Sequence, residues 1–252
     1  TQTSAPMELF YSSSVSESYN AQQAACSDGT YLYYTTITGD GNNTYLYKFD
    51  PSTKQIVKTV NNYCYKHANG MTYHDSYLYI VDNKAIFKVN ADTLAYDSTI
   101  DMSSLSTSIK DFDIISSIAY NNSIGKFIIR YKDTNLVRGI AILSDEFVCE
   151  KYIPLSFDVS NTGTDFDTVG NKVLLGVFKE KIGERYDATF IYLTDTNGNL
   201  IKKVQLCRDS NTKLIELESI VVINNKAYIF FTDVFNSYKS YSIYTVDLNK
   251  IL

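Results

Sequence analysis

Residues 69–80 read NGMTYHDSYLYI: a short strand pattern, a tight turn at His74-Asp75-Ser76 and a second strand pattern, which together predict a β-hairpin. Residues 23–34, QAACSDGTYLYY, have the same organisation. Three further segments repeat it more loosely: SSIAYNNSIGKFII at 116–129, DFDTVGNKVLLG at 165–176 and ESIVVINNKAYIF at 218–230. The copies begin at 23, 69, 116, 165 and 218, and these intervals match the length of one four-stranded blade of a β-propeller.

A second pattern recurs in phase with the first. Each unit continues into another strand that ends in a small polar turn, at 45–50, 85–90, 139–144, 190–195 and 242–247. The fifth unit ends soon after this strand, but an isolated apolar strand at 7–11 precedes the first unit and would complete the last blade, which removes an exposed sheet edge. We therefore predict an all-β chain, a single domain over residues 1–252. Its fold is a five-bladed β-propeller of four-stranded antiparallel blades, with the N-terminal strand closing the last blade.

The composition agrees with this fold and narrows the classes of partner. Tyr (22) and Phe (13), which favour strands, are abundant, and hydrophobic residues reach 44%, enough for a packed core. The net charge of −5, without a basic run, argues against nucleic acid as a partner. No segment approaches 18 consecutive apolar residues, so membrane insertion is not expected. The chain begins without Met, as a processed protein or an excised domain would.

Common metal, redox and nucleotide motifs are not found. The four cysteines, Cys26, Cys64, Cys149 and Cys207, lie far apart without a CxxC pair, which indicates free thiols rather than a zinc site or a redox dithiol. A GxSxG nucleophile elbow, a P-loop and a GxGxxG stretch are also missing. The sequence therefore gives no basis for nucleotide binding and no recognisable nucleophile–base arrangement.

The repeat places one polar residue per blade at an equivalent position beside the central channel. We expect these five residues to surround the axis and to bind a ligand, an ion or ordered water, or simply to line a hydrated channel: Gln23, Asn69, Ser116, Asp165 and Glu218.

Two pairs of acids fall on the last two blades. Residues two apart on a strand face the same side, so Asp165 can point with Asp167, and Glu216 with Glu218. Four neighbouring carboxylates would bind a hard cation such as Ca²⁺, hold one proton at a raised pKa, or serve as an acid–base pair. Alternatively, they are solvated residues at the blade ends.

Histidines and tyrosines supply the remaining candidates. His67 and His74 flank the first strand of the second blade. For His67, a structural role in which its side chain bonds a turn in the adjoining blade explains the position at least as well as a functional role. Aromatic rings at the rim could stack on sugars, and six tyrosines fall at or near inter-strand segments. These are Tyr19, Tyr63, Tyr65, Tyr73, Tyr186 and Tyr238, of which Tyr65 and Tyr73 are expected to be exposed.

The stretch KHANGMTY at 66–73, within the five-unit arrangement, resembles the five-bladed propeller domains of receptor-binding tail proteins from phages of Gram-positive bacteria. The similarity in organisation extends from about residue 20 to the end of the chain, although only these eight residues are distinctive. This resemblance implies host attachment: recognition of a cell-wall glycopolymer at the virion or cell surface, within a larger, homo-oligomeric assembly.

A second resemblance is to plant-type glutaminyl cyclases, which are also five-bladed propellers. Gln23-Ala24-Ala25 before the Asp28-Gly29 turn, and the IELE stretch at 215–218, look similar to motifs of that family. Ala24 stands where the family has Gly, and the chain contains no Trp for the family's aromatic pocket. This alternative would make Glu216 or Glu218 the acid–base group of an enzyme. The hypothesis we favour from sequence is a non-enzymatic module that binds a bacterial surface glycan and has no resident cofactor.

Overall fold

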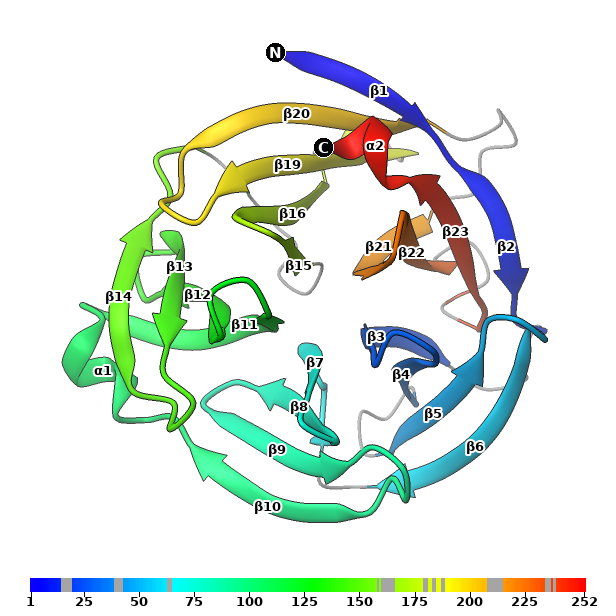
Figure 1. Cartoon of the computed structure of the whole chain (residues 1–252), viewed down its shortest axis with the longest axis horizontal. Coiled ribbons are helices and arrows are strands. Elements are labelled where there is room, and N and C mark those ends of the chain that lie inside the picture. Colours follow the sequence, from blue (N-terminus) through cyan, green and yellow to red (C-terminus); the bar gives the residue numbers. More distant parts are fainter. Residues whose placement is uncertain are drawn as a thin grey trace.

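The computed structural model describes residues 1–14, 20–38, 43–62, 65–157, 159, 166–178, 181–182, 185–186, 189–207, 215–233, 237 and 239–252. Over these residues the chain forms five blades, each built on antiparallel strands, around a central axis, which confirms the predicted propeller (Figure 1). The described helices are two single turns, α1 (Leu105–Ser108) and α2 (Leu248–Ile251). None of the described helices has the length and apolar character needed to cross a membrane.

Each blade begins at the axis and proceeds outward along the chain. Blade 1 contains β3 (Ala21–Ser27), β4 (Leu32–Ile37), β5 (Thr44–Asp50) and β6 (Gln55–Asn62). Blade 2 contains β7 (Gly70–His74), β8 (Tyr77–Asp82), β9 (Ala85–Asn90) and β10 (Tyr96–Asp101). Blade 3 contains β11 (Phe112–Asn121), β12 (Lys126–Asp133), β13 (Arg138–Leu143) and β14 (Cys149–Pro154).

The last two blades share the N-terminal segment. Blade 4 contains β15 (Phe166–Val169), β16 (Lys172–Phe178), β19 (Thr189–Asp195) and β20 (Leu200–Cys207), and blade 5 contains β21 (Ile215–Ile223), β22 (Lys226–Asp233) and β23 (Tyr241–Asp247). A separate small hairpin is formed by β17 (Lys181–Ile182) and β18 (Arg185–Tyr186).

The N-terminal segment closes the ring as predicted and does one thing more. Strand β2 (Glu8–Ser12) pairs antiparallel with β23 and is the fourth strand of blade 5. The preceding strand, β1 (Gln2–Pro6), pairs parallel with β20 and adds a fifth strand to blade 4, which the sequence did not predict. Residues 2–12 therefore join two neighbouring blades along their outer edges (Figure 1).

The hydrophobic core is divided among the five spaces between adjacent blades. Because side chains alternate across a strand, Ala24 and Cys26 pack toward blade 2 while Ala25 packs toward blade 5. The ring is also closed by polar contacts between blades 5 and 1: the Tyr34 and Tyr241 hydroxyls lie 2.7 Å apart in a buried hydrogen bond. Both faces of an inner strand are thus buried, which leaves its ends and the channel as the accessible parts.

The inner strands approach one another closely. A Cβ added to Gly70 on β7 would lie 2.6 Å from the Cα of Ser117 on β11, well inside van der Waals contact. Glycine at position 70 therefore permits the backbones of blades 2 and 3 to meet beside the channel.

Candidate functional site

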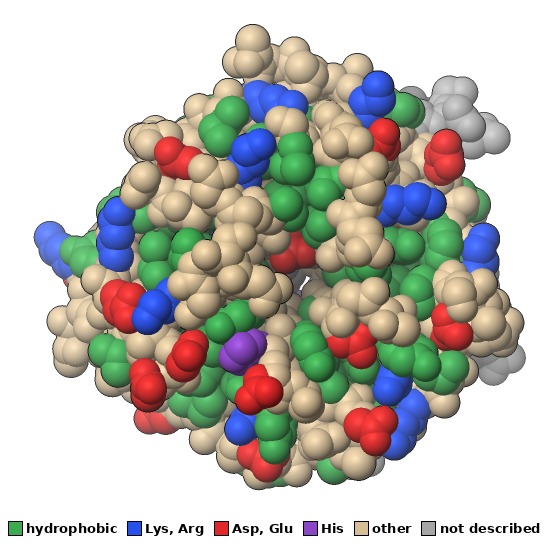
Figure 2. Space-filling model, in the orientation of Figure 1, with side chains coloured by type: hydrophobic (Ala, Val, Ile, Leu, Met, Phe, Trp, Pro, Cys, Tyr) green, Lys and Arg blue, Asp and Glu red, His purple; other side chains and the backbone are tan. Residues whose placement is uncertain are grey.

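A cavity of about 430 Å³ opens at the centre of one face of the ring. It lies at the carboxyl-terminal ends of the five innermost strands, so every blade contributes to its wall. Figure 2 shows this face hollowed at its centre, with an acidic side chain inside the hollow and Lys and Arg side chains farther out. The residues that line the cavity come from 25–29, 71–75, 120 and 122, 166–168 and 220–224.

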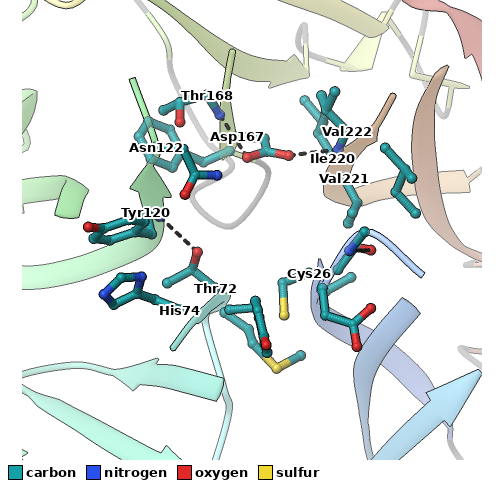
Figure 3. Close-up of a pocket in the computed structure, with 18 of the residues that line it drawn as sticks. Cys26, Thr72, His74, Tyr120, Asn122, Asp167, Thr168, Ile220, Val221 and Val222 are labelled. Atoms are coloured by element: carbon teal, nitrogen blue, oxygen red, sulfur yellow. Dashed lines mark hydrogen bonds between the residues drawn. The ribbon is translucent and has the colours of Figure 1, made fainter. Parts of the chain in front are cut away.

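Asp167, on β15, projects into this cavity between blades 4 and 5 (Figure 3). Its Oδ2 accepts a hydrogen bond from the backbone N–H of Val222 on β21 at 2.7 Å, and its Oδ1 accepts one from the N–H of Thr168 at 2.7 Å. Although part of the side chain faces the cavity, protein surrounds the carboxyl group. The resulting desolvation raises its pKa to about 7, against the opposing effect of the two N–H donors.

A carboxyl group with this pKa is present in both forms near neutral pH. The charged form can accept hydrogen bonds from a ligand or pair with a cation, and the neutral form can donate one. Since a carboxylate offers about four acceptor positions and two are used, capacity for a ligand remains.

Two almost fully buried side chains face the cavity beside this carboxyl group. Cys26 is a free thiol with 7% of its surface exposed, and its pKa is raised chiefly by burial and then by the negative charges of Asp167 and Asp28. The Oγ1 of Thr72 accepts a hydrogen bond from the N–H of Tyr120 at 2.8 Å, which ties β7 to β11. The thiol is therefore protonated, a poor nucleophile but a small polar surface for a ligand.

An aromatic pair forms one wall of the mouth. His74 stacks on Tyr120 with ring centroids 3.5 Å apart and planes at 19° (Figure 3). The Tyr120 ring also packs against Phe127 in a T-shaped contact, with ring centroids 4.9 Å apart, which supports the stack. Tyr73, half-buried, lines the same cavity, so its predicted place near a ligand site is compatible with the structure.

Three of the five residues predicted to form a ring occupy equivalent positions in the structure. Gln23, Ser116 and Glu218 each fall at a register shift between the first and second strands of their blade. All three are more than nine-tenths buried, and the Gln23 Oε1 and Ser116 Oγ atoms have no hydrogen-bond partner among the described residues. A β-bulge redirects the side chains around it. The repeated polar position therefore coincides, in these three blades, with an irregularity in the pairing of the innermost strand.

The other two ring positions differ. Asn69 immediately precedes β7, and its Oδ1 accepts a hydrogen bond from Nδ1 of the exposed His67 at 2.9 Å. Its Nδ2 lies 3.5 Å from the carbonyl oxygen of Ile115 in the next blade. Asp165 lies outside the described residues, so convergence of all five residues on the axis stays a prediction.

Of the four predicted acids, Asp165 lies outside the described residues, and the other three do not come together as one cluster. The Asp167 carboxyl group is bonded to Val222 on β21. Glu216 lies six residues earlier on the same strand, and at roughly 3.3 Å per residue the backbone positions of Glu216 and Val222 are about 20 Å apart. Burial raises the pKa of Glu216, and Glu218 is buried nearer the other end of the channel. Within the described part of the chain, no group of three or more His, Cys, Asp or Glu side chains could hold a metal ion.

The expected exposure of Tyr65 is wrong. This residue is fully buried, in a tilted contact with Phe87 at 5.7 Å between ring centroids, because it packs into the core between blades 1 and 2. Of the other tyrosines expected at the rim, Tyr19, Tyr63 and Tyr238 fall outside the described residues, as does Cys64. Tyr186 lies in β18, and its side chain is not described.

Sequence reasoning placed its ring at the start of each inner strand, whereas the cavity lies at the strand ends. It therefore missed Cys26, Thr72, Tyr120 and Asn122 as lining residues. The same repeat contained the signal, because Cys26, Tyr120 and Asn122 occupy the last positions of an inner strand or the turn that follows it, and Thr72 lies two residues before the end of β7.

Comparisons with known proteins identify the fold. No family model matches the chain, and neither does any curated protein. Among solved structures, a GH43_1 enzyme from Xanthomonas citri in complex with xylose matches 97% of this chain and 90% of its own, with a TM-score of 0.59 and 12% identity. Regucalcin from Agrobacterium tumefaciens, a calcium-binding protein, matches over 97% and 96%, with a TM-score of 0.53 and 11% identity.

A third structure, the AfRom2 CNH domain, matches 91% of this chain with a TM-score of 0.45 and 12% identity, and this chain spans 65% of its length. At their identities, the likeness to the GH43_1 enzyme and to regucalcin shows the β-propeller architecture alone. The class defined by fold and site is thus a five-bladed β-propeller with an acid-containing cavity at the centre of one face.

Proposed function

We propose that this propeller is a recognition module that binds a carbohydrate in the central cavity without turning it over. The observation that carries the proposal is the cavity itself, about 430 Å³ in volume and built by all five blades. This volume lies within the range of small-molecule sites. Its wall combines aromatic rings, on which the C–H face of a sugar can stack, with polar groups for the hydroxyls.

The named residues divide these tasks. Tyr73 and the His74–Tyr120 stack supply flat apolar surface at the mouth. Asn122, exposed in the turn after β11, and the Asp167 carboxyl group supply hydrogen-bonding groups on another side. Support for the ligand class comes from the GH43_1 structure with xylose, a sugar-bound protein of similar fold.

The biological setting we propose is attachment to a bacterial surface. The stretch 66–73, which resembles phage receptor-binding propellers, continues into β7, and Met71, Thr72 and Tyr73 within it line the cavity. The ligand would then be a cell-wall glycan or polymer, and the protein would act outside the cell or on a virion, in a homo-oligomeric assembly. Since each sugar contact only replaces a contact with water, we expect a dissociation constant of roughly micromolar to millimolar for one site. Several copies engaging together would then raise the overall affinity for a cell surface.

The test compares cavity tyrosines with a matched tyrosine elsewhere. Tyr73→Ala and Tyr120→Ala should each weaken retention of the protein on purified bacterial cell walls and shift the titration with released wall sugars to higher concentration. Tyr152→Ala, on the outermost strand β14 where 40% of the side chain is exposed, should behave as wild type.

Two results would reject the proposal. Equal binding by all three variants would place the ligand elsewhere on the molecule. Cyclisation of N-terminal glutaminyl peptides that is abolished by Glu216→Gln or Glu218→Gln would show an enzyme of the glutaminyl-cyclase type instead.

A further inference from the structure

We propose that the carbohydrate recognised in this cavity carries a positive charge, as a sugar with a free amino group does. This inference rests on the proposed function and specifies its ligand. The inference is based on the three carboxyl groups that line the cavity, those of Asp28, Asp75 and Asp167, which come from blades 1, 2 and 4.

These carboxyl groups differ in how far they are already occupied. Asp28 is held in its turn by the N–H groups of Thr30 and Tyr31 and by the Tyr33 hydroxyl, so it acts on a ligand mainly through its charge. Asp75 is exposed at the tip of the β7–β8 turn. Asp167 uses one acceptor position on each oxygen for a backbone N–H and keeps others for a ligand.

The other titratable groups that line the cavity with Asp167 come from three elements. Strand β3 and its turn contribute Cys26 and Asp28, β7 and its turn contribute Tyr73, His74 and Asp75, and β11 contributes Tyr120. Strand β21 contributes the Val222 N–H. Among the described residues, the lining includes these carboxyl groups and no Lys or Arg, and Figure 2 shows the Lys and Arg side chains of this face farther from the central hollow.

Buried polar groups aimed into the cavity give a second, independent indication of a ligand. The Cys26 thiol and the Thr72 hydroxyl are each 7% exposed, yet both line the cavity (Figure 3). Thr72 Oγ1 accepts one hydrogen bond, from the N–H of Tyr120, which leaves its second lone pair for a donor. Together with Asp167 these atoms offer acceptor positions inside the cavity, while the Thr72 hydroxyl and the protonated Cys26 thiol each keep a hydrogen to donate.

An ammonium group fits such an interior because it has three donors and no acceptor. Its hydrogen bond to a carboxylate is charge-assisted and stronger than that of a hydroxyl group. A free-amino sugar should therefore bind about 10- to 100-fold more tightly than its neutral counterpart. A uronic acid should bind more weakly than either, because its carboxylate meets like charge.

The experiment uses an array of matched monosaccharides: glucose, galactose and mannose, each as the parent sugar and as its amino, N-acetylamino and uronic acid forms. Binding of the full chain at pH 7 should favour the amino members at least tenfold over their N-acetylated partners. Raising the salt concentration should reduce this preference, since added salt screens the charges.

A variant pair isolates the charge. Asp75→Asn should reduce the preference for amino sugars while preserving the fold, because position 75 is exposed with a φ of 48°, a conformation that Asn tolerates. Asp97→Asn, an exposed acid on the outer strand β10, should leave the preference unchanged. Equal binding of amino and N-acetylated sugars would overturn this inference and leave the proposed function standing, whereas binding of no sugar would overturn both.

Discussion

Replacing Asp167 with Asn should reverse the order of stability of variant and wild type between acidic and basic pH. The reason is the buried carboxyl group, whose pKa rises from 3.8 to about 7 on folding. The folded protein therefore binds this proton more tightly than the unfolded chain. Its contribution to stability is complete below about pH 4 and is lost as the pH rises to about 7. Asn has no proton to lose, so the variant lacks this dependence.

The magnitude follows from the shift. Three pKa units at about 1.4 kcal/mol each amount to about 4 kcal/mol of unfolding free energy lost by the wild type between pH 4 and pH 8. The variant instead loses one of the two hydrogen bonds donated by Val222 and Thr168, because the Asn amide nitrogen cannot accept a hydrogen bond. That loss is about 1 to 3 kcal/mol at every pH. Asp167→Asn should thus be less stable at pH 4 and more stable at pH 8.

Urea denaturation of both proteins at pH 4, 6 and 8, followed by circular dichroism, measures the effect. The difference in unfolding free energy should change by about 4 kcal/mol in favour of the variant as the pH rises, which corresponds to roughly 10 °C in Tm. Asp97→Asn, at an exposed outer strand, controls for the loss of a charge. Parallel pH profiles for Asp167→Asn and wild type would refute the buried-carboxyl reasoning.

Three further outcomes follow from the packing. Tyr65→Ala should lower the unfolding free energy by about 3 to 5 kcal/mol and Tyr65→Phe by much less, because the ring is fully buried; a wild-type urea midpoint for the alanine variant would contradict this. Gly70→Ala should lower Tm more than Gly125→Ala. At position 70 the added Cβ meets a backbone atom at 2.6 Å, whereas at position 125 its nearest contact is 3.9 Å and the cost is only the left-handed φ of 63°. The reverse order would disprove the close approach. Removing residues 1–12 should increase proteolysis far more than removing residues 1–6, because only the longer deletion takes β2 from the edge of blade 5, and equal digestion rates would argue against β2 as the closing strand.

The candidate site was predictable only in part. The repeat identified the inner strands and the positions of Gln23, Ser116 and Glu218, where three strands change register. It could not show that Tyr65 is buried, because Tyr is common both in β-sheet cores and at rims. Nor could it bring Asp167 to Val222, 55 residues later in the chain, since that contact depends on how blades 4 and 5 pack.

The sequence by itself determined the number of blades, the order of strands within each blade and closure by an N-terminal strand, because strand alternation and turn residues are local and recur with the length of a blade. Only the tertiary structure decided which end of the channel opens into a cavity, which acids share it and which pKa is raised. The parallel pairing of β1 with β20 likewise required the ring to close first, since these strands lie about 200 residues apart. Such features arise from contacts between distant blades, and a pattern within one blade holds no information about its neighbour's depth, tilt or desolvation.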